Sequence, residues 1–142
     1  MLTSLQNPLI KQLRKLHRTK ERREQQVFLL EGTHLIEEAF AIDLSFLTVC
    51  CTETWQTQHQ ELFEQLPNRC DRLELVSPEV MKAIATTVEP DGIVATIEQF
   101  HTRPVEFAQL GLVLETIQDP GNLGTIIRTA AAAGIEGLWL SE

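Results

Sequence analysis

The stretch QDPGNLGTIIRTAAAAG, residues 118–134, joins a loop rich in proline and glycine to a small, apolar helix. The segments LVLETI before it and GLWLS after it are apolar, and each is typical of a buried strand. Gly134 stands where a helix is expected to stop. The stretch therefore predicts a βαβ unit, in which a right-handed helical crossover joins two parallel strands.

The loop of this unit is a candidate site for an anion or a ribose-phosphate. Gly121 and Gly124 are expected to let the backbone turn tightly and to expose amide groups at the positive end of the helix. Asn122 is expected to cap that helix. One stripe of the helix is polar and holds Asn122, Thr125 and Thr129, with Arg128 beside them. The alternative is a tight turn with a purely structural cap, since neither a P-loop nor a G-x-G-x-x-G fingerprint is present.

Before residue 100, short apolar strands alternate with amphipathic helices, as in a layered α/β domain. The expected strands are QVFLLEG, FLTVCC, RLELV and GIVATIEQF. Thr33 and Ser77 are expected to cap helices, and Pro78 suits a first helical turn. Because HTRPVEFAQLG breaks this rhythm, we place a boundary there and predict domains at residues 1–105 and 106–142.

Charge is strongly separated along the chain. Residues 1–23 hold seven lysines and arginines against one acidic residue, Glu21, so their net charge is +6. The whole chain carries −8, which leaves −14 for the residues after Arg23. Such a chain is able to bind a polyanion with one end while its acidic body limits unspecific adhesion.

The basic N-terminal segment is expected to form an amphipathic helix. Its leucines recur at helical spacing, so one side is expected to pack against the protein: Leu5, Leu9, Leu13 and Leu16. The basic side chains that project elsewhere form a candidate phosphate-binding face, namely Lys11, Arg14, Lys15 and Arg18. The alternative is an ordinary solvated helix surface, because no aromatic side chain is interleaved to stack on bases.

Composition narrows the remaining classes of function. Of the 142 residues 43% are hydrophobic, but no run of about 18 apolar residues suggests a membrane span. No signal-peptide pattern is seen, so we expect a cytoplasmic protein without a membrane partner. The cysteines lack zinc-ligand spacing and are expected to be buried, reduced thiols: Cys50, Cys51 and Cys70. The histidines are scattered, so no metal site is expected at His17, His34, His59 or His101.

The segment LETIQDPGNLGTIIRTAAAAGIEGLWLSE resembles the first signature motif of the SpoU/TrmH branch of the SPOUT RNA methyltransferases. Seven residues stand where that motif expects them: Asp119, Pro120, Asn122, Gly124, Arg128, Ala130 and Gly134. FLLEGTHLIEEAF and SPEVMKAIATTVEPDGIVATI resemble the substrate-binding domain that precedes the catalytic domain in many members. The resemblance thus covers most of the chain.

The resemblance implies a fold and an activity. The fold is α/β, with a small ribosomal-protein-like substrate-binding domain followed by the first βαβ unit of an α/β-knot (SPOUT) domain that works as a homodimer. The activity is transfer of a methyl group from S-adenosylmethionine to a ribose 2′-hydroxyl of rRNA or tRNA, without a metal. Arg128 and Asn122 match catalytic positions of the motif, while Gly121, Gly124 and Thr125 join the basic face as substrate-binding candidates.

Arginine chemistry narrows the role that the resemblance implies for Arg128. A guanidinium is a poor proton acceptor at neutral pH. We therefore expect Arg128 to hold the RNA phosphate and to stabilise charge developing on the attacking 2′-oxygen.

The sequence departs from the family pattern at its end. It stops at Glu142, and the motifs that in this family form the knot and hold the methyl donor are absent. We therefore expect no complete cofactor pocket in these 142 residues, an inactive fragment, and cofactor contacts that stay unassigned. The alternative function is a non-catalytic RNA-binding module, in which the first domain does the binding.

Overall fold

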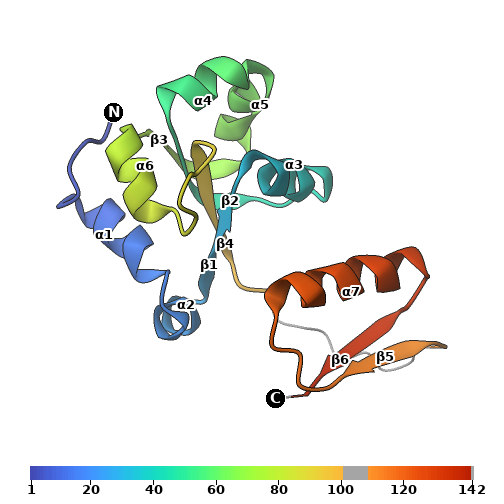
Figure 1. The fold of residues 1–142 in the computed structure, drawn as a ribbon. Helices are drawn as coiled ribbons and strands as arrows, with labels where there is room; N and C mark the ends of the chain where they lie inside the picture. Colours follow the sequence, from blue (N-terminus) through green and yellow to red (C-terminus); the bar gives the residue numbers. More distant parts are fainter. Residues whose placement is uncertain (101–108, 142) are drawn as a thin grey trace. The chain divides into compact units, whose positions relative to one another are not determined.

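A computed structural model describes residues 1–100 and 109–141 of the chain. The chain divides into two compact units, Met1–Phe100 and His101–Glu142, and each is described by itself (Figure 1). The boundary predicted between residues 105 and 106 lies outside the described residues. Among the described helices, none is both long and apolar enough to cross a membrane.

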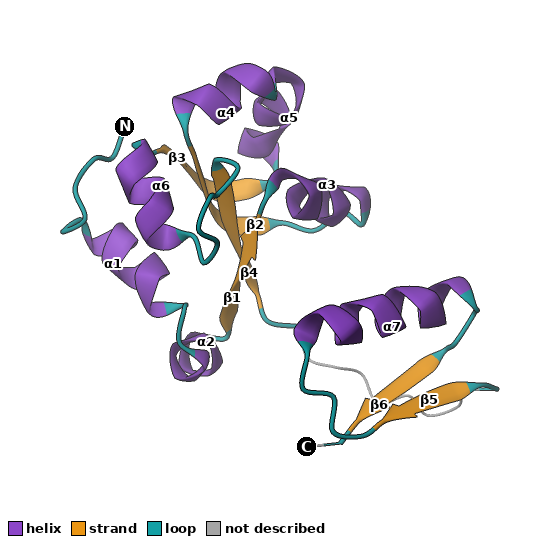
Figure 2. Cartoon of the chain, in the orientation of Figure 1, coloured by secondary structure: helices purple, strands orange, loops and turns teal. Residues whose placement is uncertain are grey.

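The first unit is a four-stranded sheet with helices on both faces (Figure 2). Its strands are β1 (Val27–Glu31), β2 (Phe46–Cys51), β3 (Cys70–Leu75) and β4 (Ile93–Glu98). Its helices are α1 (Pro8–Lys15), α2 (Thr19–Gln25), α3 (Thr33–Ala41), α4 (Glu53–Gln58), α5 (Gln60–Gln65), the short 3-10 helix η1 (Leu66–Asn68) and α6 (Pro78–Ile84). The strand order is β1-β4-β2-β3, with β4 antiparallel to both neighbours and β2 parallel to β3. The predicted α/β layering is confirmed.

Each face of this sheet has its own apolar core. Helices α3, α4 and α5 cover one face, where Trp55 and Phe46 are almost completely buried. Helices α1 and α6 cover the other face, where Ile10, Met81 and Ile84 are equally buried. Removing these large side chains from water stabilises the unit, and α1 is therefore an integral layer of the domain.

The N-terminal segment differs from the single long helix predicted. Helix α1 begins at Pro8, and the Asn7 side chain caps it by accepting a hydrogen bond from the backbone N–H of Leu9 at 2.9 Å. A separate helix, α2, follows after a turn. Leu5 therefore lies before the helix and is 38% exposed, so the expectation that it packs is wrong. The buried apolar side consists instead of Ile10, Leu13 and Leu16, with Leu9 half-buried.

Two predicted helix caps have different outcomes. Ser77 caps α6 as expected, because its Oγ accepts from the backbone N–H of Val80 at 3.3 Å. The cap predicted at Thr33 is wrong. The carboxylate of Asp91 accepts from the Thr33 backbone N–H at 2.6 Å, and the Thr33 hydroxyl instead accepts from the indole N–H of Trp55 at 2.7 Å. A partner distant in sequence has replaced the local one.

The second unit contains β5 (Gly111–Leu114), α7 (Pro120–Ala132) and β6 (Gly137–Leu140). The two strands are parallel, and their register runs from Gly111 opposite Gly137 to Leu114 opposite Leu140. Gly134 follows the helix with a φ of 75°, a conformation that favours glycine. The predicted βαβ unit and its helix stop are therefore confirmed.

Candidate functional site

Helix α7 positions the residues of the motif stretch. It begins at Pro120, and Asp119 is its N-cap, with Oδ1 accepting from the backbone N–H of Asn122 at 2.7 Å. The prediction that Asn122 is the cap is therefore wrong. Asp119 takes that role because Pro120 is pre-shaped for the first helical position, which places Asn122 inside the first turn.

The two glycines of the stretch lie within the helix and not in the loop that was predicted. A Cβ at Gly121 would lie 3.0 Å from the capping Oδ1 of Asp119. A Cβ at Gly124 would lie 3.4 Å from Nη1 of Arg128. Gly121 thus makes room for the capping carboxylate of Asp119, whereas a Cβ at Gly124 would be in van der Waals contact with the Arg128 guanidinium.

The side chain of Arg128 lies along α7. Its Nη2 donates to the Thr125 hydroxyl at 3.3 Å, and that hydroxyl donates to the Gly121 carbonyl at 3.0 Å. Arg128 is exposed, and in the described part of the chain no carboxylate forms an ion pair with it. The helix therefore presents a pre-positioned cation that is open to an anionic ligand.

The structure brings together some of the predicted site residues of α7 but not all of them. Gly121, Gly124, Thr125 and Arg128 form one continuous surface. Asn122 is exposed on the first turn, and among the described residues no hydrogen bond joins its side chain to Arg128. The expected polar stripe thus centres on Thr125 and Arg128.

The basic face of α1 borders a hollow. The hollow has a volume of about 500 Å³ and is lined by Lys11, Arg14, Lys15, His17, Arg18 and Ala83. All four predicted phosphate-binding residues therefore line one concave surface, at the end of α1 where Arg14 and Lys15 also suit the negative helix terminus. Sequence reasoning missed His17, although its position three residues after Arg14 in the basic run was a usable signal.

Other basic residues of the N-terminal segment have structural contacts. Nη1 of Arg22 donates to the carbonyls of Leu16 at 2.7 Å and His17 at 2.9 Å, which holds the turn between α1 and α2. Lys20 pairs with Glu24 on the surface of α2 at 3.6 Å. The structure thus separates the cations that line the hollow from those engaged within the protein.

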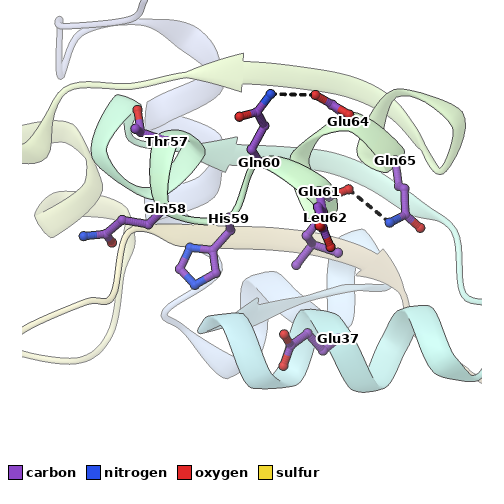
Figure 3. A pocket seen from close by; sticks show the side chains of 9 residues that line it. All are labelled: Glu37, Thr57, Gln58, His59, Gln60, Glu61, Leu62, Glu64 and Gln65. Atoms are coloured by element: carbon purple, nitrogen blue, oxygen red, sulfur yellow. Dashed lines mark hydrogen bonds between the residues drawn. The ribbon is translucent and has the colours of Figure 1, made fainter.

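A larger hollow of about 700 Å³ lies beside α3, α4 and α5 and has the opposite charge (Figure 3). Glu37, Glu61 and Glu64 line it together with several glutamines and His59. The His59 ring stacks on Trp55 with 4.8 Å between ring centroids. Among the described residues, no group of three or more His, Cys, Asp or Glu is placed to hold a metal ion.

The cysteines of the sheet are not suited to nucleophilic chemistry. Burial raises the pKa of the Cys50 and Cys51 thiols to about 12; Cys51 adds to the shift of Cys50, and Cys70 adds to the shift of Cys51. Cys70 is half-buried, and burial also raises its pKa. All three thiols are free, and the two buried ones stay protonated at neutral pH.

Comparison with known protein families gives two matches. A family model described as MRM3-like substrate binding domain matches residues 7–95. A model described as SpoU rRNA Methylase family matches residues 109–142. The two matches fall on the two compact units and together cover nearly all described residues.

Similar proteins carry methyltransferase names. An uncharacterized tRNA/rRNA methyltransferase of Synechocystis is 54% identical over 99% of this chain and 52% of its own length. The 23S rRNA (guanosine(2553)-2'-O)-methyltransferase RlmP of Bacillus subtilis is 30% identical over 99% of the chain and 54% of its own length. The AdoMet-bound rRNA methyltransferase structure from Sinorhizobium meliloti has a TM-score of 0.77 at 32% identity and covers 99% of this chain and 54% of that one. The chain thus spans about half the length of the relatives it matches.

Proposed function

We propose a function for this chain from the family to which it belongs, the SpoU rRNA methylases with an MRM3-like substrate-binding domain. The whole protein transfers a methyl group from S-adenosylmethionine to a ribose 2′-hydroxyl of rRNA or tRNA. In it, residues 1–105 form the RNA substrate-binding domain, and residues 106–142 form the N-terminal portion of the SPOUT methyltransferase domain. The 2′-O-methyltransferase name of RlmP supports the choice of hydroxyl.

One observation on α7 carries this proposal. The Arg128 guanidinium lies next to Gly124 and donates to the Thr125 hydroxyl. A guanidinium held in this way has only part of its donors occupied, so its remaining N–H groups are open to phosphate and hydroxyl oxygens. This arrangement falls within the segment that matches the SpoU model.

The residues of α7 have distinct parts in the proposed reaction. Arg128 binds the phosphate next to the reacting ribose and stabilises the negative charge that develops on the 2′-oxygen. The Thr125 hydroxyl holds the guanidinium in position, and Gly124 lies beside it. Gly121 makes room for the capping Asp119, and Asn122 shapes the same surface from the first turn. Because a guanidinium has no acceptor site, the hydroxyl proton leaves to another acceptor.

S-adenosylmethionine supplies the methyl group when it is bound to the whole protein. The hollows described above border α1, α3, α4, α5 and α6, all within Met1–Phe100. Neither hollow is lined by the described residues of the βαβ unit, and the cofactor contacts of the whole protein stay unassigned. We propose that the described residues bind and orient the RNA and that Arg128 also stabilises the charge that develops in the reaction.

RNA binding is assigned to the basic hollow. Lys11, Arg14, Lys15 and Arg18 neutralise phosphates there, while the acidic remainder of the chain limits unspecific contacts. We propose further that the whole protein is a cytoplasmic homodimer without a membrane partner. The three free cysteines support a reducing compartment.

Single-turnover methylation with saturating RNA and methyl donor tests the catalytic assignment in the full-length protein. Arg128→Ala is expected to lower the rate by about 100-fold, the size expected for losing one oriented donor, while RNA affinity falls only modestly. Arg128→Lys should not restore the rate, because the ammonium group of lysine lacks the coplanar N–H donors with which a guanidinium reaches two oxygens at once. A near-normal rate for Arg128→Ala would remove the catalytic role of Arg128 and leave a tight turn and helix cap as the role of this stretch. Absence of methylation by the unsubstituted full-length protein would instead favour the non-catalytic RNA-binding module.

A further inference from the structure

The basic hollow contains a titratable side chain outside the predicted site, His17. Its Nε2 lies 2.8 Å from the backbone carbonyl of Ile84, at the end of α6. A carbonyl oxygen only accepts hydrogen bonds, so Nε2 carries the hydrogen and donates. The nitrogen left for a ligand is Nδ1, which is an acceptor while the imidazole is neutral.

The backbone at His17 is held as well as its ring. Arg22 donates to the His17 carbonyl at 2.9 Å and to the preceding Leu16 carbonyl at 2.7 Å. With the ring bound to α6 and the backbone bound to α2, His17 has little freedom to lose when a ligand binds. The imidazole is thus a positioned group within the hollow.

The charged groups around this imidazole have one predominant sign. Helix α1 and the turn after it contribute the four cations that line the hollow with His17: Lys11, Arg14, Lys15 and Arg18. Helix α2 contributes Arg22. Helix α6 carries Glu79 and Lys82, but its lining residue is the uncharged Ala83. Among the described residues that line the hollow there is no carboxylate, so an anion is the ligand that fits.

We propose that Nδ1 of His17 binds an RNA phosphate in this hollow and takes up one proton from solvent when RNA binds. The proposal rests on the function proposed above, in which this face binds RNA. An unprotonated Nδ1 repels a phosphate oxygen, whereas a protonated one donates a charge-assisted hydrogen bond. RNA affinity therefore rises as pH falls through the range in which histidines titrate.

The test measures RNA binding by the full-length protein at two pH values. The probe is a fluorescent oligouridylate of roughly 12 nucleotides, within the usual size of a single-strand site, without terminal phosphates. Its Kd is expected to be about tenfold lower near pH 5.5 than near pH 8, as for an interaction worth about one pKa unit. Calorimetry in buffers of different ionisation enthalpy should show net uptake of about half a proton per RNA bound at intermediate pH, the largest value that a tenfold change in affinity allows for one site.

Two variants assign the proton to His17. His17→Gln keeps an amide donor for the Ile84 carbonyl and removes the titrating group, so the affinity is expected to be nearly independent of pH. His34→Gln is the matched control, because His34 is an exposed histidine on α3 outside the basic hollow. It should keep the pH dependence of the unsubstituted protein. Nitrogen NMR shifts of the His17 ring, recorded with and without RNA, should show directly in the unsubstituted protein that this ring takes up the proton.

The outcomes separate this proposal from the function on which it rests. Normal RNA binding with an unchanged pH dependence in His17→Gln, or NMR shifts that show no protonation of the His17 ring, would overturn the role of His17 alone. Failure of the unsubstituted protein to bind oligouridylate or duplex RNA at either pH would instead overturn RNA binding by this face. Tight binding of polyaspartate in place of RNA would identify an acidic protein segment as the ligand and would overturn both.

Discussion

The ring of Trp139, on β6, lies directly over Gly111, the first residue of β5. A Cβ at residue 111 would overlap Cζ3 of the indole, well inside the 3.0 Å that non-bonded Cβ contacts keep. Residue 111 must therefore be glycine for Trp139 to hold this position. The contact links the two strands of the βαβ unit outside their backbone hydrogen bonds.

Gly111→Ala is expected to displace the Trp139 ring and to destabilise the βαβ unit by about 1–3 kcal/mol, as overpacking does. Acrylamide quenching of tryptophan fluorescence measures the displacement, because Trp139 is 43% exposed whereas Trp55 is buried. Equal quenching in Gly111→Ala and the unsubstituted protein would contradict the contact.

Gly124→Ala is expected to shift the Arg128 guanidinium, which would lie 3.4 Å from the new Cβ. Alanine raises helix propensity by about 1 kcal/mol over glycine, so α7 should become no less stable. The methylation rate of the full-length protein should nevertheless fall by about tenfold, a value between that of the unsubstituted protein and that of Arg128→Ala, which loses the donor. Thermal unfolding measured beside single-turnover rates distinguishes this from a folding defect. An unchanged rate would mean that Arg128 does not act from the position seen here.

Lys15→Gln and Lys20→Gln make the same change in charge at two different places. Lys15 lines the basic hollow, whereas Lys20 pairs with Glu24 on the surface of α2. Lys15→Gln should reduce the slope of log Kd against log salt by about 0.7 for single-stranded RNA, and Lys20→Gln should leave it nearly unchanged. Combined replacement of Lys11, Arg14, Lys15 and Arg18 should reduce the slope further without changing sequence preference. Equal slopes for the two single variants would mean that RNA responds to the overall charge of the protein and not to the basic hollow in particular.

Glu31→Gln is expected to loosen the segment that follows α6. Burial raises the pKa of Glu31, but hydrogen bonds from Thr87 and Thr86 outweigh burial and lower it overall. A lowered folded-state pKa contributes stability above the unfolded-state value of 4.5, and this stability is lost as pH falls through the folded-state pKa. At neutral pH the variant should lose about 1 kcal/mol, allowing for solvent screening. Urea unfolding should show that the difference in unfolding free energy between the two proteins shrinks in acid. A difference that stays constant with pH would contradict hydrogen bonding of Thr86 and Thr87 to an ionised Glu31.

The buried thiols should resist modification in the folded protein. Because burial raises the pKa of Cys50 and Cys51 to about 12, almost no thiolate is present at neutral pH. A disulfide reagent should therefore modify Cys70 first and the other two only on unfolding. Mass spectrometry of the modified peptides gives the order, and early labelling of Cys50 would contradict the burial seen here.

Local sequence signals predicted the strands and the βαβ unit. Alternation of apolar runs with helical periods located β1, β2, β3 and β4, and Gly134 marked the end of α7. Ser77 was a correct cap because Pro78 directly after it left few alternatives. These features depend on residues within a few positions of each other, so the sequence carries them directly.

Competition between two nearby caps was harder to predict. Asp119 and Asn122 both suit the start of α7, and the structure uses Asp119 because Pro120 sets the first helical position. The N-terminal segment was predicted as one helix because its leucine spacing continues, but the contacts of Arg22 and His17 divide it after Leu16. In both places the sequence correctly predicted a helix but placed its start or end at the wrong residue.

By itself, the sequence determined the order of the elements, the separation of charge and the motif that indicates the family. Only the tertiary structure decided which side chains meet. The cap of α3 joins Thr33 to Asp91, 58 residues apart, and the hollow includes His17 because its ring bonds to Ile84, 67 residues away. Such pairs form when helices pack on the sheet, and burial of apolar faces brings them together whatever their separation along the chain.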